Sequence, residues 1–333
     1  MSTMKEIVVL SAVRTAVGSY GGGLKDVPVV DLAAAVIRAA LERSGVKPAD
    51  VGHSVLGHVI HTEPRDMYIS RYASVSGGLP VETPAFTLNR LCGSGLQAIV
   101  SAVQQIETGH CDVAVAGGAE NMSRAGYLSP SLRWGARMSD ARMVDMMVGA
   151  LTDPFEGIHM GVTAENIAEK WGISREEQDA LAVESHRRAA NAWEKGYFSG
   201  QIVPVELKGR KGTTLFERDE HFRADASLEG MAKLRPVFKK EGSVTAGNAS
   251  GLNDAASAVV LASAEYAEAN GLKPLARLVG YSHAGCEPAY MGIGPVPAVK
   301  RLLERTGLTV QEFDVLEVNE AFAAQAIAVS RAL

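Results

Sequence analysis

The chain alternates between short apolar runs and longer segments in which apolar residues recur with helical spacing. Residues 7–11 predict a buried strand, and residues 31–41 predict a helix that has Asp31 as its N-cap and stops near Gly45. A strand-like run, 54–60, follows. Because strands that alternate with helices build layers around one core, this order predicts an α/β layered fold.

The pattern continues through the middle of the chain. The small apolar run 98–103 predicts a buried helix, and residues 112–116 predict a strand. Helical spacing recurs over 163–171 and 175–195, and the second of these segments begins with a Ser-x-x-Glu pattern at 174–177 that is typical of a capping box. A small-residue loop, 245–254, leads into a run that we expect to be another buried helix, 255–262.

A short internal repeat indicates that the unit is duplicated. Residues 303–308, Leu-Glu-Arg-Thr-Gly-Leu, repeat the pattern of residues 41–46, Leu-Glu-Arg-Ser-Gly-Val. A strand-like run, 315–318, and an apolar helix, 321–330, follow the second copy. In this register residue 333 corresponds to residue 71, so we expect the second half to be incomplete and to leave a hydrophobic surface open.

The repeat and the different character of the segment between its copies predict three parts. Residues 1–121 together with 252–272 form the first half. Residues 122–251, rich in Met and charge, form an inserted loop domain, and residues 273–333 form the second half.

Composition excludes several classes of protein. Of 333 residues, 47% are hydrophobic, and a formal net charge of −5 gives no case for general nucleic-acid binding. No run of 18 apolar residues predicts a membrane-spanning helix. Three cysteines without framework spacing, and an N-terminus that runs directly into a strand without a signal-peptide pattern, predict a cytoplasmic protein.

Cys92 is the strongest candidate for chemistry. It lies in Asn-Arg-Leu-Cys-Gly-Ser-Gly, 89–95, where we expect it in the first turn of a helix. Unpaired N–H groups and the helix dipole favour a thiolate there, and Gly93 and Gly95 would let a flat acyl group approach the sulfur. The alternative is that Cys92 is an ordinary buried cysteine. We expect Cys111 to be structural, and the pattern leaves Cys286 undecided.

Four separated motifs carry a family resemblance. They are Asn-Arg-Leu-Cys-Gly-Ser-Gly, Gly-Gly-Ala-Glu-Asn-Met-Ser, Gly-Asn-Ala-Ser-Gly-Leu-Asn-Asp and Asn-Glu-Ala-Phe-Ala. In their order and spacing the chain, from about residue 5 to residue 333, resembles the thiolases, and within them the short-chain bacterial acetyl-CoA acetyltransferases and β-ketothiolases. The resemblance implies duplicated βαβαβαββ halves in an α-β-α-β-α layered arrangement, here with the second half incomplete.

The resemblance also implies a reaction and its residues. Cys92 takes an acyl group from acyl-CoA, or from a 3-ketoacyl-CoA, as a thioester, and its backbone N–H contributes to one oxyanion hole. Asn319 holds a catalytic water in another. The remaining implied residues bind coenzyme A or line the acyl pocket: Leu151, His159, Met160, Arg223, Phe238, Ala246, Ser250, Met291 and Phe322. Coenzyme A is then a substrate; we expect no metal, no permanently bound cofactor, and a homo-oligomer, either a tetramer or a dimer.

The sequence departs from the family pattern at two places. Gly230 stands where related enzymes often have serine, near the nucleotide end of coenzyme A. The family's Gly-His-Pro histidine and Cys-x-Gly-Gly-Gly cysteine do not occur in the sequence. Since losing a donor or base costs about 10²–10⁴ in rate, we expect a poor or inactive catalyst.

The sequence therefore leaves three candidate functions for the chain. The first is a thiolase that makes or cleaves short 3-ketoacyl-CoA, in fatty acid metabolism or polyhydroxyalkanoate synthesis. The second is a catalytically impaired fragment that only binds acyl-CoA or partner subunits. The third, a condensing enzyme that uses an acyl carrier protein, is disfavoured by the thiolase-type loop at 245–254.

Overall fold

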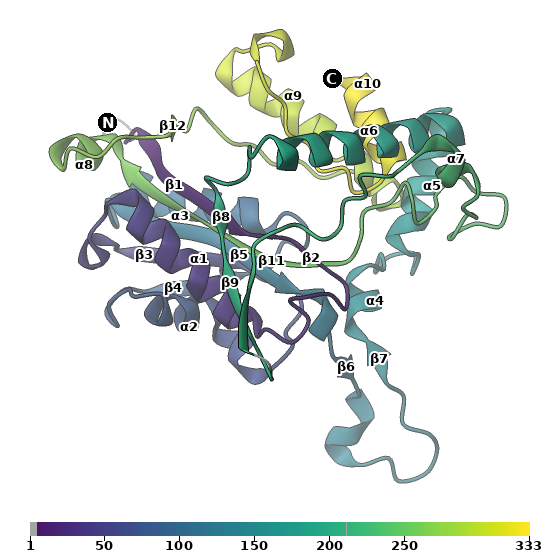
Figure 1. Ribbon diagram of the computed structural model, residues 1–333, viewed down its shortest axis with the longest axis horizontal. Helices are drawn as coiled ribbons and strands as arrows, with labels where there is room; N and C mark the ends of the chain where they lie inside the picture. Colours follow the sequence, from purple (N-terminus) through teal and green to yellow (C-terminus); the bar gives the residue numbers. More distant parts are fainter. Residues whose placement is uncertain (1–4, 211) are drawn as a thin grey trace. The chain divides into compact units, whose positions relative to one another are not determined.

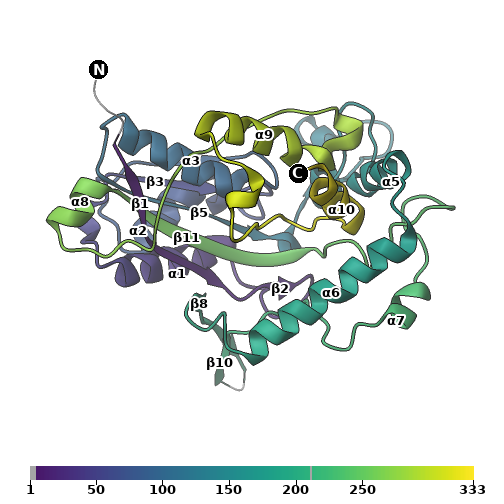
Figure 2. The same cartoon turned by 90° about the horizontal axis from the view of Figure 1, so that it is seen from above.

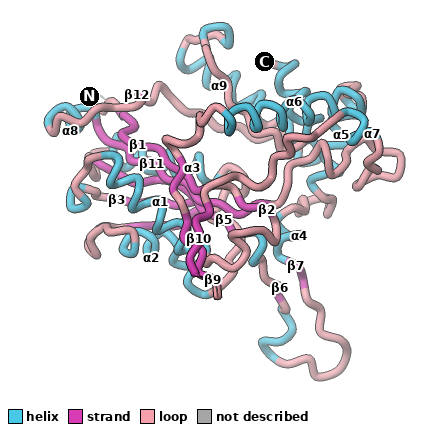
Figure 3. Tube along the Cα trace, viewed as in Figure 1, coloured by secondary structure: helices cyan, strands magenta, loops and turns pink. Residues whose placement is uncertain are grey.

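The computed structural model describes residues 5–210 and 212–333, which form two compact units. The first unit comprises Met1–Ala150, Phe198–His221 and Leu252–Leu278, and the second comprises Leu151–Tyr197, Phe222–Gly251 and Val279–Leu333. Every strand of the described residues belongs to the first unit, whereas helices and loops make up the second (Figure 3).

The first unit is built around one mixed sheet (Figure 1). Its strands are β1 (Ile7–Thr15), β2 (Gly18–Ser19), β3 (His53–Gly57), β4 (Ala85–Leu88), β5 (Val113–Asn121), β8 (Ile202–Val203), β11 (Asn253–Ser263) and β12 (Ala276–Arg277). The main order is β12-β1-β11-β5-β3-β4. β11 runs antiparallel to β1 and β5, while β3 runs parallel to β5 and β4. Two small sheets pair β9 (Val205–Gly209) with β10 (Gly212–Phe216) and β6 (Tyr127–Leu128) with β7 (Val144–Asp145).

Helices cover both faces of the main sheet. α1 (Val29–Ser44) and α2 (Ile69–Ser76) lie on one face, and α3 (Ser94–Glu107) lies on the other (Figure 2). Two shorter helices are α4 (Met146–Ala150) and α8 (Ala264–Ala269). Leu32, Val36 and Ile37 of α1 are fully buried, as is the stretch Val113–Ala116 of β5, so the core lies between helix and sheet. The α/β layered architecture is therefore confirmed.

The second unit is a helical assembly. It holds α5 (Met160–Lys170), α6 (Arg175–Glu194), α7 (Leu228–Ala232), α9 (Pro295–Thr306) and α10 (Ala323–Ala332). Ile167 and Ala168 of α5 pack against Ala324 and Ala328 of α10. Ser174 and Glu177 form the predicted capping box at the start of α6.

Most predicted elements occur, with shifted ends. Helix α1 ends at Gly45, which adopts a left-handed conformation with φ 71°, as Gly307 does after α9 with φ 72°. The repeated pattern therefore marks two helix ends of the same kind. The N-cap of α1 is Pro28, so the prediction for Asp31 is wrong; Asp31 lies in the first helical turn.

Two predicted elements are wrong. Residues 255–262 are not a helix but the centre of β11, which pairs with β1 along one edge and with β5 along the other. Periodicity alone does not separate a short buried strand from a buried helix. Residues 315–318 form no strand, because no described strand lies beside them to supply hydrogen bonds. Instead Val315 is 74% exposed. Ala324, Ala328 and Val329 of α10 are buried, so the expectation of an open apolar surface on the last helix is wrong.

Candidate active site

Cys92 lies on a tight turn between β4 and α3. The helix begins at Ser94 with Gly93 as its N-cap, so Cys92 precedes the helix rather than occupying its first turn. Leu91, beside it, has φ 43°, which is uncommon for a residue with a side chain and is found at strained functional turns. Cys92 is exposed, which contradicts the alternative of an ordinary buried cysteine.

The turn is held by Ser94 and by its own backbone. The Ser94 hydroxyl donates to the Leu91 carbonyl (2.7 Å) and accepts from the Arg90 N–H (2.8 Å). The N–H groups of Gly93 and Ser94 donate to the carbonyls of Arg90 (3.0 Å) and Leu91 (2.9 Å). Across the described residues, the backbone N–H groups of Gly95 and Leu96 donate to no protein acceptor. The start of α3 therefore keeps donors for an anion, as predicted from the helix end.

Small residues of the sheet bring α3 close to β3 and β5. A Cβ added to Gly57, at the end of β3, would lie 2.5 Å from the backbone carbon of Ser94. A Cβ on Gly118 of β5 would lie 3.5 Å from the Cα of Gly95. The first turn of the helix therefore rests directly on the strand backbone, and this contact sets the height of the Cys92 turn above the sheet.

The Gly57→Ala substitution tests this contact. The added methyl group has no room, so we expect the start of α3 to shift and the protein to lose about 1–3 kcal/mol of stability through overpacking. Urea unfolding measures the loss. Gly95→Ala is the matched control, since a Cβ there meets nothing within 4 Å. Equal stability of the Gly57→Ala variant and wild type would contradict the packing argument.

In the second unit, three predicted residues form an aromatic row. The His159 ring stacks on Phe238, with centroids 4.8 Å apart and planes 18° apart, and Phe238 meets Phe322 edge-to-face at 6.3 Å. Gly161 leaves room for this, because a Cβ there would strike the Phe238 ring. Burial lowers the pKa of His159, whose Nδ1 accepts the Gly161 N–H (3.0 Å), so the imidazole is neutral at pH 7.

The other residues predicted for the site lie in several segments of the chain. The Met160 N–H donates to the Leu151 carbonyl (2.8 Å), and the Ser250 N–H donates to the Ala321 carbonyl (3.0 Å). Ala246 belongs to the same loop as Ser250. Met291 lies in the 3-10 segment Pro288–Ile293, and the Arg223 N–H donates to His186 Nδ1 (3.2 Å). Asn319 lies in the exposed segment that precedes α10.

Two protein-family models match nearly the whole chain. The model of the thiolase N-terminal domain matches residues 7–265, and that of the thiolase C-terminal domain matches residues 272–333. The chain belongs to the thiolase family. The predicted family and fold are therefore confirmed.

Named relatives and solved structures agree with this membership. The thiolase chain is 64% identical to the beta-ketothiolase BktB of Cupriavidus necator over 99% of its own length and 84% of that protein's. It is 52% identical to an acetyl-CoA acetyltransferase of Chromobacterium violaceum, with 98% and 84% covered. A human mitochondrial 3-ketoacyl-CoA thiolase in complex with CoA superposes with a TM-score of 0.95 at 44% identity, covering 99% and 82% of the two chains.

These comparisons bear on two earlier expectations. They extend over nearly the whole thiolase chain, and both family models find their match. The prediction of an incomplete second half is not borne out by them. The alternative of a catalytically impaired fragment finds no support in them either.

The second motif of the thiolase chain is structural. Glu120 accepts the N–H groups of Val59 (2.9 Å) and Ile60 (3.1 Å), and Asn121 donates to the Leu24 carbonyl (2.9 Å). Burial raises the pKa of the Glu120 carboxyl, and the buried His58 ring lies beside it, 3.3 Å from Nδ1 to Oε1. These contacts fix the loop after β3 and the loop before α1, a role that the motif alone did not reveal.

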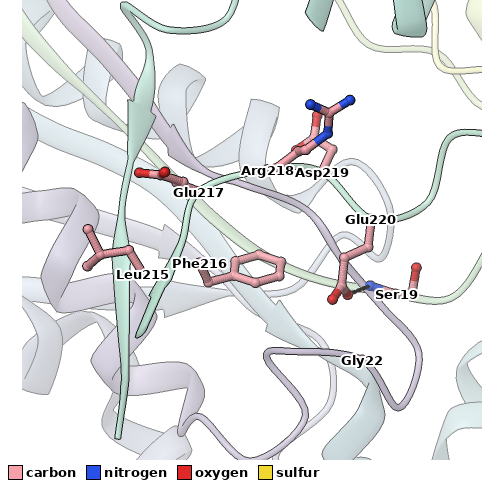
Figure 4. A pocket seen from close by; sticks show the side chains of 8 residues that line it. All are labelled: Ser19, Gly22, Leu215, Phe216, Glu217, Arg218, Asp219 and Glu220. Carbon is pink, nitrogen blue, oxygen red and sulfur yellow. Dashed lines mark hydrogen bonds between the residues drawn. The ribbon is translucent and has the colours of Figure 1, made fainter. Parts of the chain in front are cut away.

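A pocket in the first unit has none of the predicted site residues in its lining. Its lining is Ser19, Gly22 and the six residues 215–220 (Figure 4). The Glu220 carboxylate already accepts the N–H groups of Ser19 (2.8 Å) and Gly23 (3.1 Å), and Asp219 pairs with Arg14 (2.8 Å). Its acidic groups are thus used in holding loops together, and we assign it no chemistry.

Cys111 differs from Cys92 in its surroundings. Burial, with a smaller contribution from Asp112, raises the pKa of the Cys111 thiol to about 11. At about pH 8 its thiolate fraction is then about one in a thousand. We expect iodoacetamide to leave Cys111 unmodified there and to alkylate it only as the pH rises toward 11, as followed by peptide mass spectrometry. An alkylation midpoint near that of a free cysteine would contradict this.

None of the helices in the described ranges is long and apolar enough to cross a membrane.

Proposed function

We propose that the chain is an acetyl-CoA C-acyltransferase that forms or cleaves short 3-ketoacyl-CoA through an acyl group on Cys92. Its reference reaction joins two acetyl-CoA molecules into acetoacetyl-CoA and CoA, reversibly. The observation that carries the proposal is the exposed Cys92 on a strained turn, directly before α3. In the described residues, the backbone N–H groups of Gly95 and Leu96 at the start of this helix donate to no protein acceptor. An anion that develops beside the sulfur meets fixed dipoles there.

The reaction follows from this geometry in two displacements. The Cys92 sulfur attacks the carbonyl carbon of acetyl-CoA, the carbonyl oxygen takes the negative charge, and the CoA thiolate leaves as the acyl-cysteine forms. A second acetyl-CoA then loses a proton from its α-carbon, which ends on the CoA thiolate released in the first displacement, and the carbanion attacks the acyl carbon. The new carbon–carbon bond forms as the Cys92 thiolate leaves. In the cleavage direction the same steps run in reverse.

We propose that residues of the second unit hold the CoA thioester. The aromatic row of His159, Phe238 and Phe322 offers an apolar wall for the pantetheine arm, and a neutral His159 adds no charge to it. The Ser250 loop, with Ala246, and Leu151, Met160, Arg223 and Met291 complete the set assigned to CoA and the acyl group. Asn319 is assigned to the catalytic water.

The printed names of the relatives support the same substrate class. BktB is named a beta-ketothiolase, and the Chromobacterium violaceum relative is named an acetyl-CoA acetyltransferase. For this chain the proposal therefore names acyl-CoA as substrate, with no permanently bound cofactor. Three cysteines without a disulfide are consistent with the reducing environment of the cytoplasm, which we propose as the location of the protein.

We also propose a homo-oligomer, a tetramer or a dimer. The arm between β6 and β7 is mostly loop (Figure 3), and Leu132, Trp134 and Met138 on it are 57%, 87% and 91% exposed. Large apolar side chains gathered on one segment are typical of protein interfaces. The division into residues 1–121 with 252–272, 122–251 and 273–333 remains a prediction.

The direct test is to incubate the protein with acetyl-CoA, quench with acid and locate acetyl groups by peptide mass spectrometry. We expect one acetyl group, on Cys92. A mixture of acetoacetyl-CoA and CoA should yield acetyl-CoA at the same time. Acetyl transfer to any other residue, or none at all, would refute the proposal.

A further inference from the structure

Two buried carboxylates of the second unit lie against the loop that leads to Ser250. Glu165 on α5 and Asp179 on α6 are each 4% exposed. Neither has a place in the reaction described above. Acidic side chains are almost never fully buried unless they are paired, so their partners indicate what they are for.

Glu165 holds the start of the loop. Its Oε1 accepts the backbone N–H groups of Ser243 (3.0 Å) and Val244 (2.9 Å), and its Oε2 accepts the Ser243 hydroxyl (3.2 Å). The Gln178 amide donates to the same hydroxyl (2.9 Å). Gly242 lies so close to the carboxylate that a Cβ there would strike it. One side chain therefore fixes the start of the loop against α5.

Asp179 joins two segments that are distant in sequence. Its Oδ2 accepts the Arg175 Nε–H (2.7 Å), and Arg175 in turn donates to the carbonyls of Met231 (2.6 Å) and Leu234 (3.1 Å). Its Oδ1 accepts the Asn248 amide (2.9 Å). Asp179 thus links the end of α7 to the middle of the Ser250 loop.

Asn248 connects Asp179 and the Ser250 loop to the segment after Asn319. Its side chain accepts the Thr245 N–H (2.8 Å) and donates to the Ser243 carbonyl (3.1 Å), so it shapes its own loop. Its backbone carbonyl accepts the N–H of Ala323 (2.9 Å), the first residue of α10. Two residues on, the Ser250 N–H donates to Ala321. The loop and the start of α10 are therefore bound together at two points.

We propose that Asp179 is a positioning residue that, through Asn248, sets the Ser250 loop and the segment that follows Asn319 in one geometry. Glu165 holds the beginning of the same loop. The inference rests on the proposed function, which assigns Ser250 to coenzyme A and Asn319 to the catalytic water. Asp179 itself is assigned no contact with substrate; it acts by preorganising groups that make such contacts.

The Asp179→Asn variant changes one atom and tests the link. Whichever way the new amide turns, its NH₂ group faces either the Asn248 amide or the Arg175 Nε–H, so one donor meets another. We expect weaker CoA binding by calorimetry, a raised KM for acetyl-CoA and a lowered kcat. Together these should reduce kcat/KM about 10- to 100-fold.

A matched control and a second readout separate positioning from general damage. Glu184→Gln removes an acidic group from the exposed side of α6, and CoA binding should stay at the wild-type value. The rate at which iodoacetamide alkylates Cys92, which lies in the first unit, should be unchanged by Asp179→Asn. A merely structural role would lower the amount of folded protein and leave the CoA affinity and KM unchanged, and that result would overturn the proposal.

If Asp179→Asn does not fold, Asn248→Ser makes the same test, because it shortens the link and leaves Asp179 paired with Arg175. Wild-type affinity and KM in that variant would overturn the proposal. Calorimetry with CoA needs no turnover. Wild-type protein that binds CoA but leaves Cys92 unacetylated would refute the proposed function, while the CoA affinities of the variants would still decide the role of Asp179.

Discussion

Replacing Cys92 by alanine is expected to abolish acyl transfer, with kcat falling by on the order of 10⁴- to 10⁶-fold. The reason is that alanine forms no covalent intermediate, and exposed donors at the start of α3 give no catalysis without a nucleophile. The measurement is thiolysis of acetoacetyl-CoA, together with the acetyl content of the protein after incubation with acetyl-CoA. Because Cys92 is exposed, its removal should change stability by less than about 0.5 kcal/mol.

The matched control for that loss is Cys111→Ser. Cys111 is half-buried, and its thiol has a pKa raised to about 11, so it supplies almost no thiolate at pH 7. This variant should keep the acetyl group on Cys92 and lose none of the rate that depends on it. Acetylation that persists in the Cys92→Ala variant would refute Cys92 as the nucleophile.

Strands and helices were predictable where periodicity and end signals agreed. Helix α1 shows apolar spacing and a terminal glycine, and α6 opens with a capping box, so both were found. β11 was mistaken for a helix because its run of Ala and Val is apolar on every side. That pattern arises because α1 and α3 cover the two faces of the sheet at β11, which is information about neighbours rather than about the run itself.

The candidate site residues also differ in whether a local sequence pattern indicates them. Cys92 could be proposed from the sequence because glycines and a small-residue helix follow it directly, whereas the aromatic residues were proposed from the family resemblance alone. Glu165 and Asp179 were not predictable, because a carboxylate on a polar helix looks like a solvent-facing one until its partners are known. Those partners lie 78 and 69 residues further along the chain, where no local pattern refers to them.

For Asn319, the family resemblance and the structure give different kinds of information. Its role was implied by the resemblance alone, whereas the structure shows what holds the residues that follow it. The Glu320 carboxylate accepts the Ser185 hydroxyl (2.5 Å), and the Ala321 carbonyl accepts the Ser250 N–H (3.0 Å). An exposed asparagine is thereby followed by two residues held by hydrogen bonds. This arrangement suits a side chain proposed to hold a water in a fixed position.

Asn319→Ala is accordingly expected to lower kcat about 10²- to 10³-fold, the cost of losing one oxyanion donor. The KM for acetyl-CoA should change little, because the amide is proposed to act through a water at the reacting carbonyl and not on the CoA moiety. Steady-state kinetics in the condensation and cleavage directions measure both constants. The loss should occur in both, since the two directions share one transition state.

Glu317→Gln provides the control, because Glu317 is exposed in the same segment and carries no proposed role. Its kinetic constants should equal those of the wild type. If Asn319→Ala instead raised KM and left kcat intact, the residue would belong to CoA binding, because uniform binding energy affects substrate and transition state alike. If both variants lost the same activity, the whole segment would matter for its conformation, and the assignment of a catalytic water to Asn319 would fail.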